Sequence, residues 1–329
     1  MFSLIVPIYD PNDSLVPALV LPRLVEKVKH LEGEKELILV NNSPKSRRLN
    51  LYLNELVAIN GSWCKKIVCP ENLGAARGFN AGLTLASDKS TIFVFMSTDA
   101  DIVDFKMLTK IERAFINDVT LGIVHPYSAF EDADIYNINR QLSYRSYKKA
   151  VKSGRKAMDV EPSEDALSKI LRSMENAEQT VLSPIKTVPM TFAAIAKKLI
   201  LNVGSFDNRF LFGCHENNDL AFRSLKAGYK VARLNNIFVN HKRFTVRELT
   251  VKNNKELKQL PHGAAGAQAG EWWLEKYKKH YDEIYFEFRY GYFLFKVFYI
   301  YFLAIRVIRK LILNRRVSIS YQKNENQAG

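Results

Sequence analysis

Two carboxylates with the spacing of a cation site follow an apolar run near position 95. In "FVFMSTDADIVDF", residues 93–105, four apolar residues lead to Asp99 and Asp101, which are two positions apart. Carboxylates at the end of a buried strand suit a hard divalent cation that keeps ligand positions for phosphate oxygens. Acidic residues in such places also serve as helix caps or solvated loop residues. The motif alone leaves both interpretations open.

A phosphate site is the chemistry that the segment "ENLGAARGFNAG", residues 71–82, suggests. Gly74 and the helix that we expect after it would offer backbone N–H groups to a phosphate, and Arg77 would add a positive charge. The alternative is an ordinary helix entered through a tight turn, with Arg77 in solvent.

Alternating strand and helix patterns position these residues. Short, nearly continuous apolar runs such as "SLIVPIY", "KELILVNNS", "KKIVCP" and "STIFVFMST" predict parallel strands covered on both faces. The segments between them, including "LVLPRLVEKVKHLEG" and "AARGFNAGLTLAS", have helical periodicity. The sequence therefore predicts an α/β fold with a doubly wound, mostly parallel sheet, whose ligands collect at the carboxyl ends of the strands.

The pattern changes twice further along the chain. Residues 127–183 form a polar insertion with a strongly basic stretch, on the side where we expect an acceptor. Residues 284–313 are dense in aromatic side chains, but Lys296 and Arg306 interrupt the apolar run. A basic, Tyr-lined stripe beside a wide apolar face predicts a helix in a membrane interface; packing, an oligomer contact and a true span are the alternatives.

Taken together, several segments resemble the inverting family 2 glycosyltransferases, which have the GT-A fold, and in particular rhamnosyl- and related bacterial enzymes of polysaccharide or lipid-linked glycan synthesis. The likeness lies in "SLIVPIYD", "ELILVNNSP", "NLGAARGFNAGL", "STDAD", "GSFDNRFLFGCHENNDLAFRSLKAGYKV" and "NH" at 240–241. It spans about residues 1–245 and implies a transferase domain there. The aromatic and basic pattern described above predicts a helical, membrane-associating region over 246–329.

The resemblance also implies the roles of individual residues. Asp99 and Asp101 would hold Mg²⁺ or Mn²⁺ on the donor diphosphate, and His241 would complete that contact. The nucleotide-sugar donor would be bound by Pro7, Tyr9, Asp10, Asn41, Asn42, Asn72, Gly74, Arg77, Asn80 and Asp99.

Two positions depart from the family pattern. Asn41 stands where an Asp often accepts the N3–H of uracil or thymine; its amide oxygen can accept the same bond without charge. Asn217 stands where the family often has its catalytic base, and an amide cannot take a proton. We therefore expect Glu216 to be the base. His215 is the alternative, and Asp219 is either part of the site or a favourable acid in the first helical turn.

The expected reaction is an inverting transfer of a hexose or deoxyhexose from a UDP- or dTDP-sugar. A formal net charge of +14 favours an anionic or membrane-anchored acceptor, such as a polyprenyl-diphosphate-linked oligosaccharide or a surface glycan. The N-terminus lacks the pattern of a signal peptide, and three cysteines without metal spacing fit a reducing compartment. We expect a cytoplasmic protein at the inner face of the plasma membrane. The sequence is compatible with an oligomer.

Other classes fit less well. No G-x-G-x-x-G follows the first strand, as a dehydrogenase requires, and no Gly-rich basic loop follows it, as a nucleotidyltransferase usually has. The basic residues are not joined to a nucleic-acid recognition motif, so no nucleic-acid partner is expected. A nucleotidyltransferase, or a nucleic-acid- or glycan-binding protein that reuses the fold without catalysis, remains the alternative.

Overall fold

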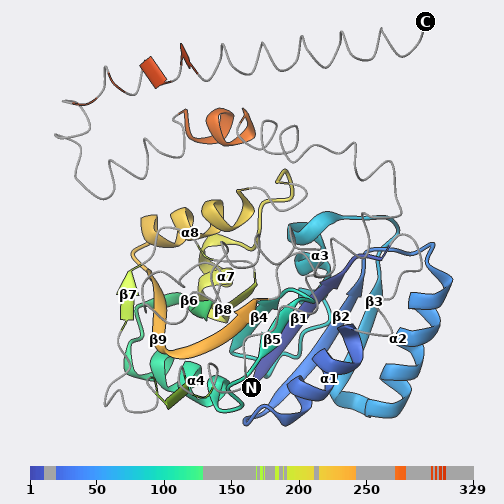
Figure 1. Ribbon diagram of the computed structural model, residues 1–329. Coiled ribbons are helices and arrows are strands. Elements are labelled where there is room, and N and C mark those ends of the chain that lie inside the picture. Colours follow the sequence, from blue (N-terminus) through green and yellow to red (C-terminus); the bar gives the residue numbers. More distant parts are fainter. Residues whose placement is uncertain are drawn as a thin grey trace, which may run out of the picture. The chain divides into compact units, whose positions relative to one another are not determined.

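The structure is a computed structural model of the chain (Figure 1). It describes residues 1–10, 20–128, 191–210, 215–241 and 271–278, with the isolated positions 168, 171–172, 174, 182–184, 188, 298, 301, 304–305 and 307–308. The chain divides into two compact units, Met1–Leu260 and Pro261–Gly329. The sheet and every residue expected to act in catalysis or binding of donor and metal fall in the first unit.

Four parallel strands form the first half of the sheet. Their order is β3-β2-β1-β4, and each neighbouring pair is parallel. The strands are β1 (Phe2–Ile8), β2 (Lys35–Asn41), β3 (Cys64–Val68) and β4 (Ile92–Met96). The helices between them are α1 (Leu21–His30), α2 (Arg47–Asn60), a short 3-10 helix (Gly61–Trp63) and α3 (Gly74–Leu83). The strands and helices that the sequence predicts in this half are confirmed.

The second half of the sheet mixes strand directions. β8 lies antiparallel between β4 and β6, whereas β9 is parallel to β6 and antiparallel to both β5 and β7. These strands are β5 (Ala100–Ile102), β6 (Leu121–Ser128), β7 (Leu182–Pro184), β8 (Phe192–Ala196) and β9 (Lys230–His241). The helices are α4 (Met107–Asn117), α7 (Lys197–Val203) and α8 (Glu216–Lys226). The predicted α/β class is confirmed; the antiparallel β8 is not a feature that the sequence pattern predicts.

Helices cover both faces of the sheet. Buried side chains of α1, α2 and α4 share one apolar cluster with Leu4 and Val6 of β1. Buried side chains of α3, α7 and α8 share another with Ile5. Successive residues of β1 thus face opposite layers, which explains why the strand reads as a continuous apolar run. α3 lies close against the sheet, because a Cβ added to Gly82 would come 2.3 Å from Ile5 Cγ2.

A buried polar cluster ties β1 and β2 together near the start of β1. The carboxylate of Glu36, 2% exposed, accepts hydrogen bonds from Ser3 Oγ (2.6 Å) and the Ser87 amide (2.6 Å) and pairs with Lys65 Nζ (2.7 Å). Burial alone raises the pKa of Glu36, but the hydrogen bonds from Lys65, Ser3 and Ser87 outweigh it, so the pKa lies below its ordinary value.

The second unit contributes a short helix within residues 271–277, where the rings of Trp273 and Tyr277 lie 4.5 Å apart. Large apolar side chains further along are exposed: Phe298, Tyr301, Val307 and Ile308. Among the residues that the structure describes, no helix is both long and apolar enough to cross a bilayer. Most of the predicted insertion at 127–183 lies outside the described residues.

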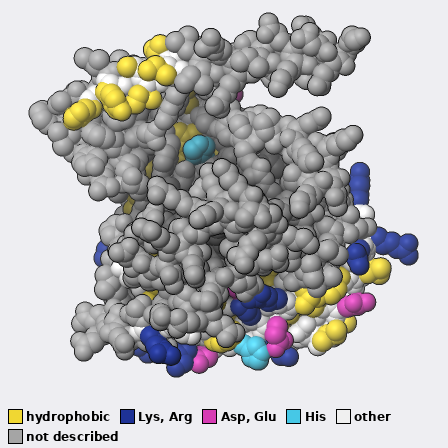
Figure 2. Space-filling view, viewed as in Figure 1, with side chains coloured by type: hydrophobic (Ala, Val, Ile, Leu, Met, Phe, Trp, Pro, Cys, Tyr) yellow, Lys and Arg dark blue, Asp and Glu magenta, His cyan; other side chains and the backbone are white. Residues whose placement is uncertain are grey.

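Lys and Arg side chains lie along the lower margin of the molecule in Figure 2, where Figure 1 places α1, α2 and α4. Among the described residues of that margin, acidic and apolar side chains lie between the basic ones. The basic surplus of the chain is therefore not gathered into a single patch on this margin.

Candidate functional site

The loops after β1, β2 and β3 meet at one edge of the sheet. The Asn42 amide donates to the Ile8 carbonyl (2.8 Å), and the Cys69 amide donates to the Asn41 carbonyl (2.9 Å). The Asp10 amide donates to Ser43 Oγ (2.7 Å). Because these strands are parallel, their carboxyl ends lie together, as predicted. Pro7 and Tyr9 are half-buried at this edge, and Asp10 is fully buried.

The two amides after β2 have different surroundings. Asn41 Oδ1 accepts from the Ser43 amide (2.7 Å), and its Nδ2 donates to Asn50 Oδ1 (2.7 Å). Both ends of this amide are therefore bound within the chain, and a base contact by Asn41 stays a prediction. Asn42 Nδ2 donates to the Gly74 carbonyl (3.0 Å), while its buried Oδ1 has no hydrogen-bond partner in the described part of the chain.

Polar residues at the start of α3 hold neighbouring loops. Asn72 Oδ1 accepts from the Gly74 amide (3.0 Å), so the first amide of the helix already has a partner. Arg77 Nε donates to the Asn208 carbonyl (2.7 Å), and Asn80 Nδ2 donates to the Phe206 carbonyl (2.8 Å). These contacts join α3 to the turn that precedes the α8 region. A guanidinium has five N–H donors, and the Asn208 contact uses one of them.

The Asp-X-Asp motif bridges β4 and β9 at the same edge. The Ser97 amide donates to the Thr191 carbonyl (3.0 Å), and Ala100 lies opposite His241 in the β5–β9 ladder. The backbone of His241 is thus beside the motif, and its contact with a metal or diphosphate stays a prediction. Asp99 is half-buried and its Oδ1 accepts from Ser97 Oγ (2.6 Å).

Asp101 has charged partners of its own. Lys27 Nζ contacts Oδ1, Arg23 Nη2 lies 3.3 Å from Oδ2, and Asn240 Nδ2 lies 3.4 Å from Oδ2. Across the described residues, no three His, Cys, Asp or Glu side chains gather as a metal site would require. With two cations on its carboxylate, Asp101 does not fit a divalent cation in this arrangement.

The start of α8 places Glu216 at this edge. α8 runs antiparallel to β9, which follows it through a short turn, so the helix begins near the edge at which β9 ends (Figure 1). His215, just before the helix, has a left-handed backbone with φ 65°, a conformation that is costly for a residue other than glycine. Asn217 Nδ2 donates to the Val188 carbonyl (2.6 Å), which fixes the first turn to the segment that leads into β8.

Glu216 is enclosed in an unusual way for a carboxyl group. Its side chain is 1% exposed, and its buried Oε2 has no hydrogen-bond partner among the described residues. Burial raises the pKa of Glu216 to about 7, with a smaller opposing effect from its own backbone amide. A carboxyl group with a raised pKa at a ligand-binding edge is a candidate acid or base.

Asp219 holds structure instead of facing an open site. It is fully buried, and its Oδ2 accepts from Arg223 Nε (2.8 Å) one helical turn later. The same guanidinium donates to the carbonyls of Val203 (2.5 Å) and Ser205 (2.7 Å). The pair thus fastens the end of α7 to α8, a contact between distant segments that residue spacing does not reveal.

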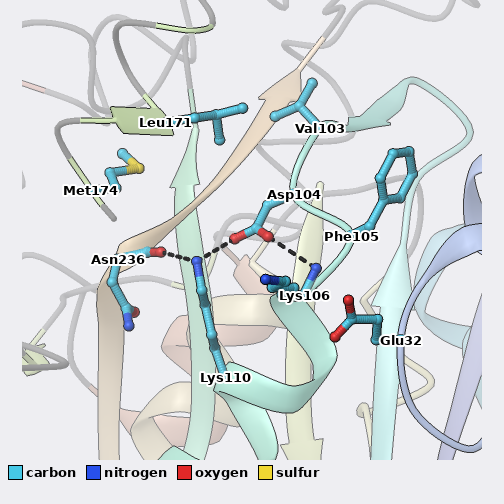
Figure 3. Close-up of a pocket in the computed structure, with 9 residues that line it drawn as sticks. All are labelled: Glu32, Val103, Asp104, Phe105, Lys106, Lys110, Leu171, Met174 and Asn236. Atoms are coloured by element: carbon cyan, nitrogen blue, oxygen red, sulfur yellow. Dashed lines mark hydrogen bonds and ion pairs between the residues drawn. The ribbon is translucent and has the colours of Figure 1, made fainter. Parts of the chain in front are cut away.

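A cavity of about 280 Å³ lies elsewhere, around the start of α4 (Figure 3). The Glu32 amide donates to the Phe105 carbonyl (2.8 Å), which places the cavity toward the edge where β1 begins. Lys110 Nζ, which lines it, contacts Asp104 Oδ2 (2.7 Å) and the Asn236 carbonyl (3.1 Å). Lys110 and Asp104 thus form an ion pair in the lining, and the cavity is separate from the residues above.

A sequence profile of Glycosyl transferase family 2 matches residues 3–158, which include β1 to β6. No curated protein matches the sequence significantly. The profile match, with the fold, supports a glycosyltransferase.

Solved structures with a similar fold include GalNAc-T7 with UDP, GalNAc and Mn²⁺, at 12% identity and a TM-score of 0.53, over 73% of this chain and 43% of that one. Others are the mannosyltransferase PcManGT from Pyrobaculum calidifontis with GDP-Man and Mn²⁺ (14% identity, 82% and 72% coverage, TM-score 0.48) and S. aureus TarS 1–349 (15%, 87% and 72%, 0.46). The sheet of this protein is that of the GT-A glycosyltransferases. The chain spans less than half of the GalNAc-T7 chain.

Proposed function

We propose that this protein is an inverting glycosyltransferase that moves a hexosyl or deoxyhexosyl group from a UDP- or dTDP-sugar to a glycan or lipid-linked acceptor in cell-surface polysaccharide synthesis. The observation that carries the proposal is Glu216, a buried carboxyl group with a pKa of about 7 at the carboxyl edge of a GT-A sheet. The family match over residues 3–158 supports the reaction class.

In the proposed mechanism, Glu216 removes the proton from the acceptor hydroxyl while that oxygen attacks the anomeric carbon from the face opposite the leaving nucleoside diphosphate. The configuration at that carbon is inverted as a result. A base works best when its pKa lies near the working pH, and the pKa of Glu216 meets that condition. Because Glu216 is 1% exposed, the acceptor has to uncover the carboxylate when it binds.

Arg77 on α3 would stabilise the negative charge that develops on the leaving nucleoside diphosphate. The Arg77 guanidinium keeps N–H donors beyond the one that contacts Asn208, and these would bind the diphosphate. The Mg²⁺ or Mn²⁺ that the resemblance implies would supply further neutralisation when bound; in our proposal Asp101 is not its ligand, and no step depends on it. His215 is the second choice for the base, because it adjoins Glu216.

The acceptor and the place of action belong to the same proposal. The exposed Phe298, Tyr301, Val307 and Ile308 of the second unit, together with the basic residues around them in the sequence, favour an anionic membrane surface. We infer a cytoplasmic protein, peripheral at the inner face of the plasma membrane, whose acceptor is a surface glycan or a lipid-linked one such as a polyprenyl-diphosphate-linked oligosaccharide.

Thermal unfolding with added nucleotides tests the donor class. A ligand that binds only the folded state raises the melting temperature (Tm). We expect UDP or dTDP to raise Tm by several degrees while GDP has little effect, with and without Mn²⁺. If no nucleotide changes Tm and RNA does so in a salt-dependent way, the nucleic-acid-binding alternative replaces the proposal.

A further inference from the structure

Asp101 lies inside the molecule, against α1. Its side chain is 6% exposed, and its carboxylate receives Lys27 Nζ and Arg23 Nη2 from α1 and Asn240 Nδ2 from β9. Asp101 itself lies opposite Asn240 in the β5–β9 ladder. The Asp101 carboxylate therefore joins the first turns of α1 to β5 and β9, two strands that lie far from α1 in the sequence.

The two cations need this partner. Arg23 and Lys27 are four residues apart on α1, so they face the same side of the helix and would repel one another. Lys27 is 22% exposed, and solvent screens its charge only in part. A negative charge between them offsets the repulsion and gives the Lys27 ammonium, the less exposed of the two, a charged partner.

The same contacts disfavour a divalent cation at Asp101. Such an ion would have to displace Lys27 Nζ and remain near two positive charges in a partly buried site. Asp99, the other carboxylate of the motif, is half-buried, and its Oδ1 accepts from the hydroxyl of Ser97.

We propose that Asp101 is the internal counter-ion of Lys27 and Arg23, which positions α1 on the β5–β9 pair, and is not a ligand of a divalent cation. Within the motif, cation binding then depends on Asp99. The inference concerns charge pairing inside this chain and stands apart from the glycosyl transfer proposed above.

The test compares Asp101→Asn, Asp99→Asn, Lys27→Met and the Lys27→Met/Asp101→Asn double variant in the full chain. Two quantities are measured: Tm, and the dissociation constant of Mn²⁺ from the spin-resonance signal of free Mn²⁺, with and without UDP. Asp101→Asn should lower Tm by roughly 5–10 °C, because it leaves two cations without their partner. Its Mn²⁺ affinity should stay within about twofold, whereas Asp99→Asn should weaken Mn²⁺ binding by at least ~10-fold.

The double variant separates the remaining outcomes. Because it removes one charge of each sign, its fall in Tm should be smaller than the sum of the two single falls. If Asp101→Asn does not fold, the double variant supplies the Mn²⁺ measurement. A loss of Mn²⁺ affinity of ~10-fold or more with an unchanged Tm in Asp101→Asn would overturn the inference. If the wild-type chain binds no Mn²⁺, the Tm comparison decides, and additive changes would refute the pairing.

Discussion

Glu216 is the residue on which the proposed chemistry depends, and its replacement by Gln isolates the proton-accepting step. Gln keeps the shape of the side chain but cannot take a proton. We expect turnover to fall by roughly 10²-fold or more with little change in donor affinity. Wild-type turnover should rise with pH through about 7, because the base has to be ionised. This rise should be absent from the pH profile of the variant. Full turnover of Glu216→Gln with the true acceptor would move the assignment to His215.

The raised pKa of Glu216 also predicts a cost in stability. Its pKa is about 7 in the folded protein against an ordinary 4.5, so between these values the folded protein holds a proton that the unfolded chain has released. Stability therefore falls as pH rises through this window, by up to about 3 kcal/mol. Glu216→Gln should thus raise Tm at pH 8 and change it little near pH 4. An equal shift at both pH values would show that burial of charge is not the cause.

Asn217 stands where the family pattern often has a carboxylate, but its hydrogen-bond partner in this chain favours an amide. Its Nδ2 donates to the Val188 carbonyl, and a carboxylate at that place would repel the same oxygen. Asn217→Asp should therefore lower the free energy of unfolding by about 1–3 kcal/mol and reduce turnover instead of restoring a family-like base. Asn218→Asp is the matched control, since it adds the same charge to the same helical turn. A faster Asn217→Asp enzyme would show that the native base is poorly placed.

At the scale of elements, the Glu36 cluster joins β1 and β2. Glu36→Gln replaces one carboxylate oxygen with an NH₂ group, which would face either Lys65 Nζ at the Oε2 position or the Ser3 hydroxyl and Ser87 amide at the Oε1 position. The change should cost about 2–3 kcal/mol at pH 7. Because folding lowers the pKa of Glu36, this contribution exists above the ordinary pKa and is lost as pH falls through the folded value. The difference in the free energy of unfolding between variant and wild type should therefore become smaller as the pH is lowered. The exposed neighbour Glu34→Gln is the control and should change little.

Elements with local signals could be predicted from the sequence, whereas partners far apart in the chain could not. β1 to β4 carry their own apolar patterns and turn residues, so their existence follows from short-range chemistry. The position of β8 between β4 and β6 depends on which edges remain unpaired, and no local pattern encodes that. The same holds for Asp101, because nothing in "STDAD" points to Lys27 and Arg23 on α1.

At the scale of the whole molecule, the division at Leu260 suggests where membrane binding can be removed. A chain that ends at Leu260 should keep its nucleotide-induced rise in Tm and lose sedimentation with phosphatidylglycerol vesicles, because the apolar and basic residues of the second unit are gone. Neutral phosphatidylcholine vesicles are the control, and added salt should weaken the binding of the full chain. An insoluble shortened chain would favour packing or oligomer contact as the role of the second unit.

During synthesis on the ribosome, β4 emerges long before the strand that covers its second edge. Met96 pairs with Phe192, and the whole polar insertion has to be translated between them. All five residues of β4 are buried in the finished sheet, so the nascent chain presents an apolar strand with unpaired backbone groups for that interval. Chaperones that hold extended apolar segments would therefore matter most before Phe192 leaves the ribosome, and ribosomes that stall within the insertion would release chains prone to aggregation.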